Sequence, residues 1–197
     1  MKDNKKIKWR RLDNASKIFP PTVTNRDTKV FRLYCELTED VDPEILKEAI
    51  SPTLESFPLY RSILRRGAFW YYFESSDLEP VVEEESKPLC APLYLKEEKS
   101  LLFRVFYYKK RINVEIFHAL SDGAGAVWFF ETLIYHYMTS KHKIELPDDF
   151  PKLKYKASMS QKMDDSFEKT YYKKRASEAI DKTPSVKAYQ LRGTKEE

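Results

Sequence analysis

The residues best suited to chemistry form one short stretch, His118-Ala-Leu-Ser-Asp122-Gly123. An imidazole changes its protonation state near neutral pH, so a histidine can move protons. Asp122 can cap a following helix or bind a cation, and Gly123 permits backbone angles that other residues avoid. The stretch therefore predicts a stiff loop that presents one histidine.

The sequence on either side predicts which elements position this loop. Ile112, Val114 and Ile116 are the alternate positions of a strand that ends at Phe117, directly before the histidine. Residues 124–138 are nearly all apolar and predict a largely buried helix. His118 then lies between a strand end and a helix, at the edge of a sheet.

Earlier segments predict the rest of the sheet. Residues 31–37 alternate as a strand with one buried face, and residues 101–108 form a second apolar and aromatic run. A helix should follow Asp42 as its cap, with a kink or early end at Pro52. The acidic segment around Glu83 is interpreted as a surface connection. The expected fold class is α/β, a mixed β-sheet with helices packed on it.

An aromatic hairpin is expected over residues 59–65 and 68–74, with Arg66-Gly67 as its turn. Its residues Phe69 to Tyr72 could form a stacking platform for nucleic-acid bases, but packing in the core and on the hairpin face is the favoured interpretation. The net charge of +4, from 35 basic and 31 acidic residues, gives no case for nucleic acid.

Two other chemistries compete as interpretations of the same loop. A hydrolase triad of Ser121, His118 and Asp122 is disfavoured because one short loop cannot present all three in line, and no GxSxG elbow exists. A metal site of His118 and Asp122 with His136 or His142 lacks the convergent ligand set of zinc proteins. No metal is expected.

Cysteine usage and hydropathy indicate the compartment. Cys35 and Cys90 have no partner at CxxC spacing, which argues against a redox pair. The chain shows neither a signal-peptide core nor a run of membrane-spanning length. A cytoplasmic location is the expectation.

The pattern HxxxDG, here His118, Asp122 and Gly123, resembles the signature of the coenzyme A-dependent acyltransferases, the superfamily of chloramphenicol acetyltransferase, alcohol acyltransferases and condensation domains. Trp9 to Asp13 resembles the family's opening segment, and Ala188 to Leu191 resembles the first strand of its second half. The resemblance implies one half-domain of a two-half fold whose active site is a tunnel between the halves.

What the resemblance implies is acyl transfer from an acyl-coenzyme A or acyl-carrier thioester to a hydroxyl acceptor, as in alcohol O-acetyltransferases. His118 would be the general base, while Asp122, through a cation, and Gly123 orient the loop. Acyl-coenzyme A is a co-substrate, and no cofactor is permanently bound. Phe117 stands where many amide-forming condensation domains have a second histidine, which favours an oxygen acceptor.

The family's second-half motif, Asp-Phe-Gly-Trp-Gly, is absent. The expected organisation is a half-domain at 1–145, a linker and polar helix at 146–185, and the start of a missing second half at 186–197. Alone, the chain should be inactive and could form a homo-oligomer through its exposed face. The alternative function is a non-catalytic half-domain that serves as a binding or assembly module.

Overall fold

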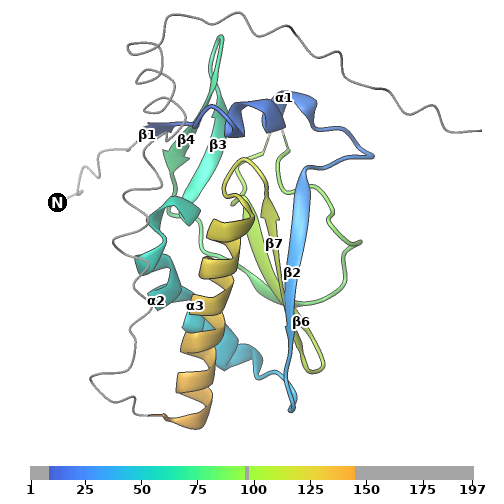
Figure 1. Ribbon diagram of the computed structural model, residues 1–197, viewed down its shortest axis with the longest axis vertical. Coiled ribbons are helices and arrows are strands. Elements are labelled where there is room, and N and C mark those ends of the chain that lie inside the picture. The colour runs from blue at the N-terminus through green and yellow to red at the C-terminus, as the bar shows by residue number, and fades with distance from the viewer. Residues whose placement is uncertain (1–8, 96–97, 145–197) are drawn as a thin grey trace, which may run out of the picture. The chain divides into compact units, whose positions relative to one another are not determined.

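The computed structural model of the protein describes residues 9–95 and 98–144. These residues form two β-sheets (Figure 1). The smaller sheet has the strand order β1 (Trp9–Arg11), β4 (Tyr71–Ser75), β3 (Ser62–Arg66). The larger sheet has the order β2 (Val30–Glu36), β7 (Arg111–Phe117), β6 (Phe103–Tyr108), β5 (Val82–Glu84).

The larger sheet is mixed, as expected. β2 and β6 both pair antiparallel with β7, whereas β5 runs parallel to β6 with Val82 opposite Val105. The interpretation of the Glu83 segment as a surface connection was wrong. β5 has only three residues at a sheet edge, and Val82 is its one apolar side chain packed on the core, so no alternating pattern marks it as a strand.

Helix α2 (Pro43–Ser56) begins where the sequence predicts, because the Asp42 side chain accepts hydrogen bonds from the first-turn amides. Of the two outcomes expected at Pro52, a kink or an early end, the early end was wrong. The helix continues for another turn, since Thr53 and Leu54 are both buried and the Thr53 hydroxyl donates to the Ala49 carbonyl at 2.7 Å. Burial of a leucine side chain is worth about 1.5–3 kcal/mol, which offsets part of the proline penalty.

Helix α3 (Gly123–His142) is longer than the predicted segment and packs beside α2 on one face of the larger sheet (Figure 1). The main core lies between these helices and the sheet. Its members include Ile112, Val114 and Ile116 from β7 and Phe129 and Leu133 from α3. The β7 alternation is thus the buried face that the sequence predicts.

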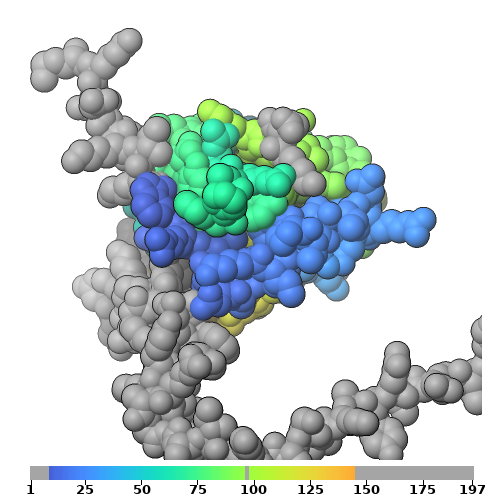
Figure 2. Space-filling model, turned by 90° about the horizontal axis from the view of Figure 1, so that it is seen from above, coloured from blue at the N-terminus to red at the C-terminus, as the bar shows by residue number. Residues whose placement is uncertain are grey.

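The β3–β4 hairpin exists, but its tip is not packed as expected. The Phe69 and Trp70 side chains are 91% and 61% exposed, while Phe73 is buried. The tip is a tight turn in which the Gly67 amide donates to the Trp70 carbonyl at 2.7 Å. From above, the green hairpin segment and the blue N-terminal elements are both visible on one face (Figure 2). The geometry of the turn places the Phe69 and Trp70 rings in solvent, and an alternating sequence pattern does not predict that geometry.

Two expectations lie outside the described residues, namely the linker with a polar helix at 146–185 and the strand start at 186–197. Within the described part of the chain, no helix combines the length and apolarity required to cross a membrane.

Candidate active site

His118 follows β7 directly and lies on a loop held by backbone hydrogen bonds. Its own amide donates to the Lys29 carbonyl at 2.8 Å, and the Leu120 amide donates to the Phe117 carbonyl at 2.8 Å. Ala119 and Leu120 are buried in the core beneath the loop. The histidine backbone is therefore anchored by hydrogen bonds on both sides.

The His118 side chain is half-buried and lies against two aromatic rings. The Phe19 ring is stacked on the imidazole with a centroid separation of 4.2 Å and an interplanar angle of 14°. The Phe31 ring of β2 is tilted by 58° at 5.1 Å. The buried Nδ1 atom has no hydrogen-bond partner in the part of the chain that the structure describes.

Asp122 is the N-cap of α3. Its Oδ1 accepts from the Gly125 amide at 2.8 Å, and its carbonyl accepts from the Ala126 amide at 3.0 Å. Asp122 forms no ion pair with any residue in the described ranges, 9–95 and 98–144. Of the two roles considered for Asp122, the geometry therefore shows the helix cap.

The conformational argument for Gly123 was wrong. No described glycine has a positive φ, and a Cβ built at Gly123 would meet no atom within 4 Å. The crowded glycine is Gly125, where a Cβ would lie 2.5 Å from the Ser121 Oγ and 3.1 Å from the Asp122 Oδ1. Gly125 lets the chain approach its own cap closely, which the spacing of the motif does not reveal.

Tyr60 is a neighbour of the loop that the sequence analysis missed. It belongs to the short helix η2 (Pro58–Tyr60) and stacks on Phe129 of α3 with centroids 4.0 Å apart. Burial raises the pKa of the Tyr60 phenol; the nearby Ser121 hydroxyl acts in the opposite direction, and the Asp122 carboxylate adds to the increase. The Tyr60 oxygen lies near the Ser121 hydroxyl but has no well-aligned hydrogen-bond partner among the described residues.

The described residues do not bring together the groups of the Ser121-His118-Asp122 triad or of the metal site considered above. The Ser121 hydroxyl donates to the Asp122 carbonyl at 3.2 Å, and His118 Nδ1 accepts no bond from it. His142 contacts Glu39 at 3.0 Å. Burial lowers the pKa of His136, against the opposing charge of Glu55. No three His, Cys, Asp or Glu side chains converge as metal ligands in the described ranges.

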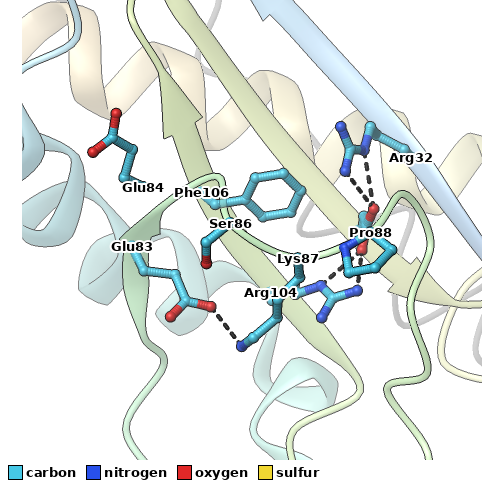
Figure 3. A pocket seen from close by; sticks show the side chains of 9 residues that line it. Arg32, Glu83, Glu84, Ser86, Lys87, Pro88, Arg104 and Phe106 are labelled. Carbon is cyan, nitrogen blue, oxygen red and sulfur yellow. Dashed lines mark hydrogen bonds and ion pairs between the residues drawn. The ribbon is translucent and has the colours of Figure 1, made fainter.

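A pocket elsewhere on the larger sheet is lined by Arg32, Arg104 and Phe106, among other residues (Figure 3). Glu115 of β7 also lines it. The Glu115 side chain is fully buried, and both Arg32 and Arg104 pair with it. At its rim Lys87 pairs with Glu83 at 2.6 Å. No residue of the His118 loop lines this pocket. Arg32 and Arg104 both bind Glu115, as expected for a buried structural cluster.

This cluster attaches the segment after β5 to the sheet. The Cys90 amide donates to Glu115 at 2.7 Å, and Arg104 donates to the Ala91 carbonyl at 2.8 Å. Burial opposes ionisation of Glu85, but hydrogen bonds from Arg32 and Arg111 lower the pKa of that carboxyl. Through these bonds, the segment after β5 covers the part of the larger sheet that carries Arg32, Arg104 and Glu115.

Comparison with known proteins shows the fold. No protein-family model matches the sequence, and no curated protein is detectably similar to it. Solved structures do match. The starter condensation domain of rhizomide synthetase RzmA is 12% identical with a TM-score of 0.52, covering 75% of this chain and 42% of that chain. A variant of that domain in complex with C8-CoA has a TM-score of 0.60 at 12% identity, covering 86% and 46%.

TRI101 of F. graminearum, complexed with coenzyme A and T-2 mycotoxin, is 9% identical with a TM-score of 0.50, covering 72% of this chain and 41% of that chain. The chain thus spans less than half the length of these solved chains. At such identities the likeness concerns the fold. The chain therefore shares, over part of its length, the fold of the RzmA starter condensation domain and of TRI101.

Proposed function

We propose that this protein, together with a second half-domain, transfers an acyl group from an acyl-coenzyme A thioester to a hydroxyl acceptor, with His118 as the general base. The observation that carries the proposal is a half-buried imidazole on an anchored strand-end loop, in a fold that also occurs in structures with bound coenzyme A. A base must be held in this way to be efficient.

In the proposed reaction the acceptor oxygen attacks the thioester carbonyl carbon while the imidazole takes the hydroxyl proton. The carbon–sulfur bond then breaks, and the leaving thiolate takes that proton from the imidazolium. The products are an ester and free coenzyme A. Nδ1 is enclosed, so Nε2 is the nitrogen assigned to proton transfer.

The apolar surroundings of His118 support an acceptor substrate that is largely apolar and carries a hydroxyl group. Phe19 and Phe31 contact the imidazole, and Phe117, which precedes it, is buried against Tyr94. None of these three phenylalanine side chains could serve as a second proton carrier. Asp122 is assigned to orientation of the loop, through its cap on α3.

The second candidate function is a half-domain that binds or assembles without catalysis. The chain spans less than half the length of the solved chains, and this share favours neither candidate by itself. Wild-type protein that binds acyl-coenzyme A but never releases free thiol in the presence of alcohols would select this alternative.

The proposal is tested by His118→Ala in a form of the protein that contains both halves. Ester formation and thiol release should fall by about 10² or more, because a positioned general base contributes about 10² to 10⁴ in rate. His136→Ala is the matched control, since it removes another half-buried imidazole from the middle of α3. Full turnover by His118→Ala would exclude His118 from the mechanism.

A further inference from the structure

We infer that Phe19 is a positioning residue for the base: its ring fixes the plane in which the His118 imidazole stands. The inference rests on the proposed function, because it concerns the same histidine. It adds a residue far from the HxxxDG motif in sequence, from the short helix α1 (Phe19–Thr22).

The geometry of the pair supports this role. At 4.2 Å and 14° the two rings are stacked nearly face to face, whereas Phe31 meets the imidazole at a steep tilt. In many enzymes a hydrogen bond to the second ring nitrogen sets the imidazole orientation. Here Nδ1 has no partner in the described part of the chain, so the contacts that restrict ring rotation are the aromatic ones.

Phe19 is itself held firmly. It follows the helical turn η1 (Ser16–Ile18), where both the amide and the hydroxyl of Ser16 donate to the Asp13 carboxylate at 2.7 Å. Pro20, the next residue, is buried, and proline allows little freedom in φ. Leu12, near the start of this segment, is buried in the core. The stacking ring is therefore placed by the fold before any substrate binds.

The stacked ring also suits the charge that forms during the reaction. When the imidazole takes the acceptor proton it becomes a cation, and the face of an aromatic ring attracts a cation. This attraction exists in the transition state and is absent for the neutral base. Loss of Phe19 should therefore reduce kcat and leave KM nearly unchanged.

The first experiment needs no enzymatic activity. The chain contains three histidines, so ¹³C-labelled histidine gives a small set of imidazole signals, assigned by single His→Gln variants. Phe19→Leu and Phe19→Met should both shift the His118 ring signals, because the ring current of Phe19 is lost, and leave those of His136 and His142 in place. Phe69→Leu is the matched control, since Phe69 is 91% exposed. His118 signals that do not respond to either Phe19 variant would overturn the inference.

The second experiment uses the two-half form. Phe19→Leu should lower kcat by roughly 10- to 100-fold, as expected when a reacting group is misplaced by about 1 Å, while Phe19→Tyr keeps the ring and should retain kcat. Full kcat in Phe19→Leu and Phe19→Met, with shifted His118 signals, would refute the positioning role. An inactive wild type whose His118 signals still respond to Phe19 would instead refute the proposed function and leave the stacked pair as a structural contact.

Discussion

The side chains of His118 and Asp122, both on the loop after β7, have different contacts. Among the described residues, His118 Nδ1 has no hydrogen-bond partner and the imidazole lies against the Phe19 and Phe31 rings, whereas the Asp122 carboxylate caps the first turn of α3. Gly125 allows that cap to approach. Within one short motif, Asp122 thus has a structural contact that His118 lacks, and substitutions should distinguish the two residues.

Asp122→Ala should destabilise the protein by about 1 kcal/mol, because the Gly125 amide loses its acceptor. Asp122→Asn should cost much less, since asparagine caps a helix as well as aspartate does. Urea unfolding at pH 7 measures both variants. Equal losses for alanine and asparagine would show that Asp122 acts through its charge, as an ion-pair partner, and not as a cap.

Alanine substitutions at Gly123 and Gly125 should have different effects on stability. Gly123→Ala should be neutral or stabilise by up to about 1 kcal/mol, because its Cβ meets open space and alanine restricts the unfolded chain. Gly125→Ala should be less stable than Gly123→Ala by about 1 kcal/mol, since its Cβ displaces Ser121 and the cap. Thermal melts of the two variants provide the comparison, and equal gains would contradict the crowding seen at Gly125.

Among the elements, the segment after β5 is held to the larger sheet by charges. Arg32 pairs with Glu85 at 2.5 Å and with Glu115 at 2.7 Å, and its guanidinium lies 4.6 Å from the centre of the Phe106 ring. Burial opposes the charge on Arg32, but its hydrogen bonds to the two carboxylates raise its pKa. Stability should therefore depend on pH through the Glu85 carboxylate.

Glu85 makes that dependence testable. Its pKa is lowered from 4.5 on folding, so ionised Glu85 contributes stability above pH 4.5 that is lost as the pH falls through the folded-state value. At pH 7, Glu85→Gln should cost about 1–3 kcal/mol, because charge-assisted bonds from Arg32 and Arg111 are weakened. Urea unfolding of both proteins from pH 7 to pH 3 should show the difference shrinking in acid. A pH-independent difference would exclude the ion pairs as its cause.

For the whole molecule, the described elements already share one apolar core, with the α2–α3 layer on the larger sheet. The chain nevertheless spans less than half of the solved chains whose fold it shares. If the active site is a tunnel between two halves, as the family resemblance implies, the described residues provide one wall. Folding and catalysis should therefore be separable.

The 197-residue chain on its own should fold cooperatively but fail to transfer acyl groups, and it should self-associate through the face that a second half would cover. Light scattering reports the association, and a free-thiol assay with acyl-coenzyme A and alcohols reports turnover. A monodisperse monomer that releases coenzyme A at an enzyme-like rate would show that one half-domain suffices.

Local patterns in the sequence determined much of this protein. The β7 alternation, the Asp42 cap and the apolar α3 segment each depend on neighbours within a few residues, and each lies where it was predicted. The HxxxDG loop was located for the same reason, since its strand and helix flank it directly. The role of His118 as a base stays a prediction.

Only the tertiary structure decided which distant residues meet at that loop. Phe19, Phe31 and Tyr60 approach it from separate elements, and none belongs to a motif at a fixed spacing from His118. The parallel pairing of β5, the continuation of α2 past Pro52 and the exposed hairpin tip also escaped local patterns. The physical reason is common to all: packing energy comes from contacts between segments far apart in the chain, and it can override local propensity.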